Sequence, residues 1–382
     1  MRRLTPPIAF LATAVSLYLA LHYYLWLRLI HAPTMPPLVA FILTLLLAAL
    51  CAVPIAFGIL PRVMGYEVPA PLERLGYLWL GSYFLLAAGV GAADLVGVLA
   101  GWVHSPSPVA LLASVNGVAT LGASVGFVCI GLALWGGLRA PAVREVQIST
   151  EGLPAGLAGL SIVQLSDVHI GPTLGSAFLA DTVRRVNALN PDLVAITGDL
   201  IDASLEEIGE MMLPLRGLKP RLGVVYVPGN HEYYHGGPAW FTYFQSLGLH
   251  VLRNQGLEFR TGDQAFYVAG LDDPTSQRAG GGGSDLQAAL RARPPGMPTL
   301  LLSHQPIGFE AAAAQGVSLQ LSGHTHGGQL FPLSLLVGLR YRFVAGLYRR
   351  GQSYLYVSCG TGFWGPPMRL GAASEITLLS FA

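Results

Sequence analysis

Residues 192–202 read DLVAITGDLID, a short apolar run that is followed at once by a glycine and two aspartates. Such runs, rich in branched residues and bounded by turn formers, are typical of strands that are buried on both faces. The polar cluster lies directly after the end of this predicted strand. Four other segments share the arrangement: LSIVQLSDVH at 160–169, GVVYVPGNHE at 223–232, PTLLLSHQ at 298–305 and VSLQLSGHTH at 317–326.

The segments around these five runs predict an α/β domain. Three more apolar runs, at 264–270, 352–358 and 375–381, are predicted strands, and residues 176–189 are a predicted helix that stops at Asn190-Pro191. In open α/β sheets, functional sites gather at the carboxyl ends of strands. We therefore expect polar clusters that are far apart in sequence to converge on one edge. Weaker helical patterns occupy 204–217, 239–248, 284–293 and 306–314.

The residue types in the five clusters are those of a metal site. Carboxylates, an amide oxygen and imidazoles suit divalent ions such as Mn, Fe, Zn or Ni. Two such cations held close together need a bridging anionic ligand, which offsets their mutual repulsion. Glycines beside the clusters let the backbone turn sharply away from each strand.

The order D-x-H, G-D, G-N-H-E, H and G-H-x-H resembles the calcineurin-like metallophosphoesterase family over about residues 158–382. The segments Leu271–Pro274 and Gly360–Arg369 look like a bacterial membrane-associated branch. Some proteins of that neighbourhood hydrolyse UDP-2,3-diacylglucosamine or related lipids. The resemblance implies a four-layer αββα sandwich of two mixed sheets flanked by helices.

The resemblance also implies roles for individual residues. One metal ion is expected at Asp167, His169 and His326, and a second at Asn230, His304 and His324. Asp199 is the expected bridge between them.

The implied activity is metal-dependent hydrolysis of a phosphoric ester or pyrophosphate by a metal-bridging hydroxide. His231 matches the family histidine that faces the scissile phosphate, so it is the expected catalytic residue. It could protonate the leaving oxygen.

Several neighbouring polar residues have more than one interpretation. Asp202 and Glu232 are expected to orient ligands or to cap helices. His235 and His250 are expected to be ordinary surface or core histidines. The pair at 272–273 either lines the cleft or forms a turn before a proline.

The first part of the chain has a different composition. Residues 1–138 carry only five arginines and three acidic residues, whereas the whole chain of 382 residues is 11% charged. Four apolar runs, each near or above the length that spans a bilayer, lie at 8–30, 38–60, 75–100 and 109–138. We therefore predict a transmembrane domain at 1–138, a linker at 139–157 and the phosphoesterase domain at 158–382. Asp94, inside the third run, is expected to be hydrogen-bonded within the bundle.

The arginines predict the orientation of this domain. They precede the first run, occupy the second connection and follow the fourth run, at Arg2, Arg3, Arg62, Arg74, Arg139 and Arg144. By the positive-inside rule, both the N-terminus and the phosphoesterase domain face the cytoplasm. A multi-pass protein of the cytoplasmic (inner) membrane is the predicted location.

The sequence says less about the substrate. The near-neutral net charge of +1 gives no reason to expect nucleic acid as a partner. The stretch 330–350 mixes apolar residues with arginines, which suits a surface at the level of lipid headgroups. A phosphorylated lipid or lipid-linked nucleotide is the expected substrate. A phosphodiesterase for soluble nucleotides and a non-catalytic membrane sensor are the alternatives.

Overall fold

The computed structural model describes residues 8–59, 68–104, 115–149 and 156–381 of the chain. Within these residues the chain forms two compact units. We call residues 8–138 together with 365–370 the helical unit, and residues 139–364 together with 371–381 the sheet unit.

The helical unit is built from long apolar helices. They are α1 (Ile8–Trp26), α2 (Pro37–Pro54), α4 (Ala70–His104) and α6 (Val115–Leu138), with short π-helical turns η1 (Leu27–His31) and η2 (Ile55–Ile59) after the first two. Among the described residues, three stretches are long and apolar enough to cross a membrane: Pro37–Gly58, Ala70–Leu99 and Gly117–Leu138. Arg2, Arg3 and Arg62, which contribute to the predicted orientation, lie outside the described residues.

Small residues bring α4 and α6 together. A side chain at Gly89 would overlap the carbonyl of Gly122, and one at Gly122 would overlap the backbone of Val90. Gly126, one turn further along α6, also lies close to the backbone of Leu86. Helices in membranes associate in this way, because small residues let two backbones approach closely.

Asp94 has its hydrogen bonds inside the helical unit. Its carboxylate accepts a hydrogen bond from the Tyr24 hydroxyl at 2.7 Å and another from Nε of Arg28 at 2.8 Å. The second arginine contact makes the pair bidentate. The carboxylate is therefore paired within the bundle, as the sequence predicted.

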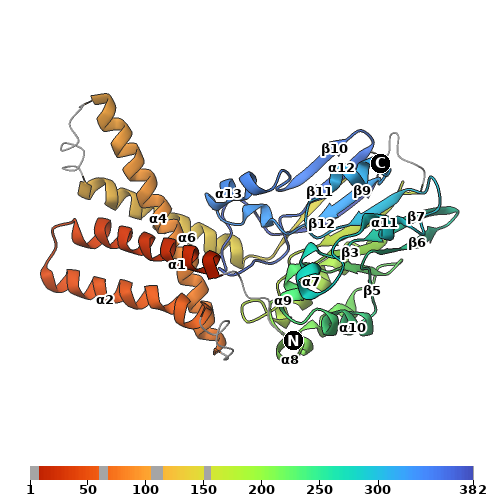
Figure 1. The fold of residues 1–382 in the computed structure, drawn as a ribbon, viewed down its shortest axis with the longest axis horizontal. Coiled ribbons are helices and arrows are strands. Elements are labelled where there is room, and N and C mark those ends of the chain that lie inside the picture. The colour runs from red at the N-terminus through yellow and green to blue at the C-terminus, as the bar shows by residue number, and fades with distance from the viewer. Residues whose placement is uncertain (1–7, 60–67, 105–114, 150–155, 382) are drawn as a thin grey trace. The chain divides into compact units, whose positions relative to one another are not determined.

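The sheet unit contains two six-stranded sheets (Figure 1). In spatial order the first is β1 (Ala142–Ile148), β12 (Glu375–Phe381), β2 (Ser161–Leu165), β3 (Leu193–Thr197), β4 (Val224–Val227) and β5 (Leu249–Val251). The second is β10 (Gly346–Arg350), β11 (Ser353–Val357), β9 (Leu319–Ser322), β8 (Thr299–Leu302), β7 (Gln264–Gly270) and β6 (Gln255–Thr261).

Both sheets are mixed. Strands β2 to β5 are mutually parallel, and β12 runs antiparallel to β2. In the second sheet β7, β8, β9 and β11 are parallel, and the two edge strands are antiparallel to their neighbours. The helices between the strands are α7 (Ser176–Ala188), α8 (Leu205–Ile208), η3 (Gly209–Gly217), α9 (Asn230–Tyr234), α10 (Pro238–Ser246), η4 (Pro274–Ala279), α11 (Leu286–Leu290), α12 (Phe309–Ala314), η5 (His326–Gly328) and α13 (Leu333–Arg340).

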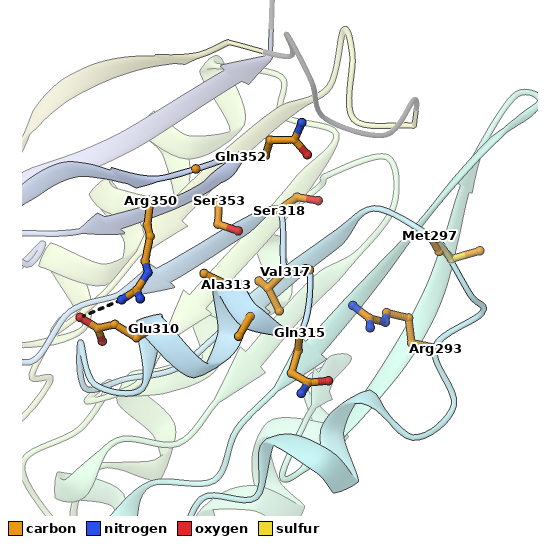
Figure 2. Close-up of a pocket in the computed structure, with 14 residues that line it drawn as sticks. Arg293, Met297, Glu310, Ala313, Gln315, Val317, Ser318, Arg350, Gln352 and Ser353 are labelled. Atoms are coloured by element: carbon orange, nitrogen blue, oxygen red, sulfur yellow. Dashed lines mark ion pairs between the residues drawn. The ribbon is translucent and has the colours of Figure 1, made fainter.

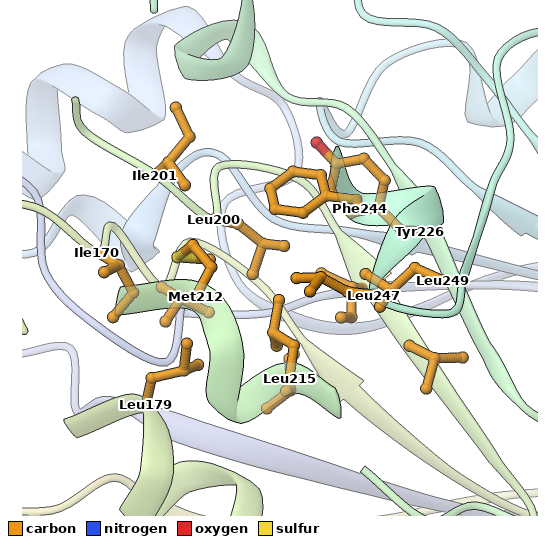
Figure 3. Close-up of a cluster of buried hydrophobic side chains, with 14 of the residues drawn as sticks. Ile170, Leu179, Leu200, Ile201, Met212, Leu215, Tyr226, Phe244, Leu247 and Leu249 are labelled. Atoms are coloured by element: carbon orange, nitrogen blue, oxygen red, sulfur yellow. The ribbon is translucent and has the colours of Figure 1, made fainter. Parts of the chain in front are cut away.

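Three buried clusters define the layers. One joins the inner faces of the two sheets, with Ile162 and Val225 from the first and Phe266 and Leu300 from the second. Another packs α7, η3 and α10 on the outer face of the first sheet (Figure 3). The third packs α11 and α12 against the outer face of the second sheet. The predicted four-layer αββα sandwich of two mixed sheets is therefore confirmed.

Strand β1 lies within residues 139–157, which the sequence indicated as a linker. It pairs in parallel with β12 along its whole length. The sequence did not reveal this strand because Arg144 and Glu145 interrupt its apolar pattern, and its first four residues are exposed at the edge of the sheet. Residues 150–155 of the predicted linker lie outside the described residues.

Candidate metal centre

The five polar clusters meet at the carboxyl ends of five strands. Asp167 and His169 follow β2, Asp199 follows β3, and Asn230 follows β4. From the second sheet, His304 follows β8, and His324 and His326 follow β9. The strands are parallel within each sheet, and contacts between the sheets, such as that of His169 with His326, show that both present their clusters at the same edge of the sandwich.

The backbone at this edge is strained. Asp167, His169, Asp199, His324 and His326 all have φ between 52° and 69°. Residues with a side chain rarely adopt this left-handed conformation, and such strain persists where function requires a side chain to be aimed at one point. Gly229 leaves room for the carboxylate of Asp199, which any side chain at position 229 would overlap.

One group of ligand atoms comes from the first and last clusters. Nε2 of His169 lies 3.1 Å from Nε2 of His326. The same His326 nitrogen lies 3.4 Å from Oδ1 of Asp167. The three residues form one of the groups in which all ligand atoms lie within 4.8 Å of one another.

A second group lies on the other side of Asp199. Nε2 of His304 is 3.2 Å from Oδ1 of Asn230, 3.1 Å from Nδ1 of His324 and 3.2 Å from Oδ2 of Asp199. The same Asp199 oxygen is 3.9 Å from Nε2 of His169 in the first group. Asp199 therefore stands between the two groups.

These spacings fit divalent metal ions. Two ring nitrogens bound to one ion at about 2.1 Å, at right angles, lie about 3 Å apart. The His169–His326 and His304–His324 pairs have this spacing. Ring nitrogens that point at one another at this spacing can all be satisfied by a cation between them, so the donor set fits two cations.

In three of these histidines, one ring nitrogen has a partner outside the centre, so the other ring nitrogen faces inward. Nδ1 of His169 lies 2.9 Å from Asp202, and Nδ1 of His304 donates to the carbonyl of Thr197 at 2.7 Å. Nε2 of His324 lies 2.8 Å from the Tyr341 hydroxyl. Such partners orient metal-binding histidines and set their tautomers, which leaves a lone pair directed at the centre.

The ionised form of the Asp199 carboxyl is stabilised by positive neighbours. Burial would raise the pKa of Asp199, but the rings of His304 and His231 outweigh it and hold that pKa well below the usual range. Burial likewise opposes a charge on His304, yet Asp199 raises the pKa of that ring well above its ordinary value. A buried carboxylate thus depends on nearby positive charge, which bound cations would supply.

His324 and Asp167 respond differently. Burial, together with the charge on His304, lowers the pKa of His324 to about 3, so its ring is neutral. Burial raises the pKa of the Asp167 carboxyl, although the His304 ring opposes the shift.

His231 lies at the centre with its Nδ1 turned to Asp202. That nitrogen is 2.5 Å from Oδ1 of Asp202, the same oxygen that contacts His169. Its Nε2 is 3.9 Å from Asp199. Burial opposes a charge on this ring, but Asp199 and Asp202 prevail and raise the pKa of His231 to about 9.

Two aromatic residues at the site could not be assigned from the sequence. Trp364 is 54% exposed, and its ring lies edge-on to His231 with centroids 5.9 Å apart. Its backbone is held on both sides by Gln329, whose amide donates to the Trp364 carbonyl at 2.9 Å and accepts from its N–H at 3.0 Å. Tyr341, which contacts His324, is the other. Only the position of Gln329 just after the G-H-x-H cluster hints at this arrangement.

The remaining polar residues have structural partners. Glu232 accepts hydrogen bonds from the backbone N–H groups of Gly229, Leu200 and Asp199, as a cap does. Asp273 caps η4 by accepting from the N–H of Thr275. Asp272 binds Arg253 and the Tyr233 hydroxyl. His250 is exposed.

An open pocket of about 630 Å³ lies elsewhere on the sheet unit. Met297, Ser318 and Gln352 line it, each at or just before the start of a strand of the second sheet, and Arg350 lies 3.7 Å from Glu310 across it (Figure 2). It is therefore at the opposite edge of that sheet from the histidines.

Known proteins are similar to this chain in sequence. The family described as calcineurin-like phosphoesterase matches residues 160–328. An uncharacterized metallophosphoesterase from Aquifex aeolicus is 32% identical, over 62% of this chain and 90% of its own length. This chain belongs to the metallophosphoesterase family.

Other relatives are longer than the matched region. A transmembrane protein with metallophosphoesterase domain from Danio rerio is 42% identical, over 64% of this chain and 59% of its own length. The chain thus spans less than two thirds of that relative. Among solved structures, a dimetal phosphatase from Danio rerio aligns with a TM-score of 0.35 and 15% identity, over 53% of this chain and 88% of that one.

Proposed function

We propose that this metallophosphoesterase hydrolyses a phosphoester or pyrophosphate bond with two divalent metal ions, in a lipid or lipid-linked nucleotide. One observation carries the proposal: ring nitrogens, an amide oxygen and carboxylate oxygens from two sheets converge at spacings of 3.1–3.4 Å. Such convergence of buried polar atoms is costly without cations.

The residues divide into two sets that share one member. Asp167, His169 and His326 would hold one ion, and Asp199 would contact both. When bound, the ions would lower the pKa of a water nucleophile and offset charge on the phosphoryl oxygens. The set for the other ion is Asn230, His304 and His324.

His231 would donate a proton to the leaving oxygen. Its raised pKa keeps the ring protonated at neutral pH, and Asp202 fixes its orientation through Nδ1. Nε2 is then the donating nitrogen. General acid catalysis of this kind is worth about 10²–10⁴-fold in rate. The exposed ring of Trp364 beside it would contact the leaving group.

The first test is turnover by the purified full chain with Mn²⁺. The panel contains a small chromogenic phosphodiester, nucleotide diesters and pyrophosphates, and long-chain phosphorylated lipids. Hydrolysis by the wild type, lost in His231→Ala with its metals retained, supports the proposal. Equal turnover by wild type and His231→Ala would contradict the role of His231, and no turnover on any substrate would contradict the activity.

The lipid part of the proposal rests on the membrane-spanning character of the helical unit and on the apolar stretch after the last cluster. The chain has three candidate spans, although one span would be enough to anchor it. A diacyl substrate stays in the bilayer, because each buried CH₂ contributes about 0.8 kcal/mol. Preference of the enzyme for soluble nucleotides over every lipid in the panel would refute this part.

We also propose that the sheet unit faces the cytoplasm from a multi-pass position in the inner membrane. The arginine distribution supports this orientation. A reporter fused after Ala382 should behave as a cytoplasmic protein. A periplasmic signal from that fusion would reverse the orientation.

A further inference from the structure

Helix α13 of the sheet unit presents leucines outward. Leu335 and Leu336 are 61% and 60% exposed, and Leu339, one turn later, is 85% exposed. None of the residues of α13 is buried. Residues spaced in this way share one face of a helix, so the three side chains form one apolar stripe. Neighbouring exposed apolar side chains of this kind are typical of surfaces that bind a membrane or another protein.

Polar contacts at the start and the end of the same helix face the metal centre instead. Ser334 packs so closely on Gly328 that any side chain at the glycine would overlap it. Tyr341, the residue that caps the helix, contacts His324 at 2.8 Å. The three leucines are therefore not packed on the core, as the apolar face of a helix on a water-soluble domain usually is.

Cationic side chains end the apolar stripe. The guanidinium of Arg340 lies 5.1 Å from the ring centroid of Tyr341, and Arg342 pairs with Glu310 at 2.9 Å. An apolar helix face bordered by arginine is complementary to an anionic membrane surface: the leucines enter the acyl boundary while the cation meets phosphate.

The sheet unit follows a candidate membrane span directly in the sequence. Three residues separate the end of candidate span Gly117–Leu138 from the start of β1 at Ala142. Four Cα–Cα steps cover at most about 15 Å. The sheet unit is thus tethered at short range to the end of a span.

We propose that α13 lies in the interface of the bilayer that holds the helical unit, with Leu335, Leu336 and Leu339 among the acyl chains. Since the helix ends at the tyrosine that contacts His324, its seating fixes the rim of the metal centre at headgroup level. The position of the helix does not depend on the proposed function. The value of that position for catalysis rests on the proposed lipid substrate.

The test is the depth of a spin label in the full chain. The chain, with its three cysteines replaced by alanine, is reconstituted in nanodiscs of equal parts phosphatidylcholine and phosphatidylglycerol. Leu336→Cys carries the label, and Leu257→Cys, 38% exposed on β6, is the matched control. The label at 336 should collide more with oxygen than with a water-soluble nickel chelate, and the label at 257 should show the reverse. Equal access of the nickel chelate to both labels would overturn the proposal and would favour a protein partner for the stripe.

A second measurement separates this inference from the proposed function. Leu335→Ser combined with Leu336→Ser should lower turnover of a long-chain lipid severalfold and spare a small chromogenic phosphodiester. A lipid-embedded label in a chain that hydrolyses nothing would support the docking and refute the activity. Lipid hydrolysis by a chain whose label stays in water would do the opposite.

Discussion

The two halves of the candidate metal centre differ in charge and in burial. The first half contributes a carboxylate of its own, Asp167, and both Asp167 and His169 are fully buried. The second half contributes only neutral ligands, Asn230 and two histidines, of which His324 is partly exposed. Ligand charge governs how tightly a dication is held. We infer that the second ion is the more labile one, although both halves share Asp199.

The partners behind the histidines differ in the same sense. His169 is backed by the carboxylate of Asp202, whereas His304 is backed by a backbone carbonyl and His324 by the Tyr341 hydroxyl. A carboxylate makes an imidazole a stronger ligand than a neutral acceptor does. Backing and charge therefore both favour the first half.

Removal of the shared ligand should have the largest effect. Asp199→Ala takes away the anionic group that lies between the two halves, so both ions should be lost. Turnover should fall by roughly 10³-fold or more, because bound cations contribute several kcal/mol of charge stabilisation. Elemental analysis checks the metal content. Asp273→Asn, a buried carboxyl outside the two sets, is the control and should keep both ions. Two retained ions in Asp199→Ala would refute the bridge.

Asn230→Ala should separate the halves. The variant loses a ligand of the second half only, so it should keep one ion per chain. Its turnover should fall about 10²–10³-fold, the usual cost of removing a preorganised stabilising group. Loss of both ions, or of neither, would show that the halves do not differ as described.

Asp202→Asn should act on the first half and on His231 together. Asp199 and Asp202 raise the pKa of His231 after burial has opposed it. Removing one of these charges should lower that pKa by about 1–3 units. Because the protonated ring is the proposed acid, activity is lost as pH rises through its pKa, so the alkaline limb of the pH–rate profile should move to lower pH. An unmoved limb would mean that another group sets it.

Tyr341→Phe should have the smallest effect, and only on the second half. The ring remains while the hydroxyl that contacts His324 is lost. Metal affinity should weaken 10–100-fold at one of two sites, as for other partners of metal-binding histidines. Metal titration of the variant measures this, with Tyr354→Phe as the control. Equal weakening at both sites would contradict the comparison.

The sequence predicted the fold and the candidate ligands to different depths. Buried strands such as β3 carry uninterrupted apolar runs, so their positions and the polar residues after them were readable. Edge strands such as β1 and β6 expose most of their residues and carry no such run. Tyr341 and Trp364 approach the centre only through tertiary packing, and no local pattern marks them. The contact of Asp202 with both His169 and His231 likewise depends on the folded geometry.

The central claim is that one chain holds two metal ions on either side of Asp199. Anomalous X-ray scattering from crystals of the Mn²⁺-loaded full chain tests it most directly. The account predicts two peaks, one among Asp167, His169 and His326 and one among Asn230, His304 and His324, both adjacent to the Asp199 carboxylate. A single peak, or peaks away from these residues, would contradict it.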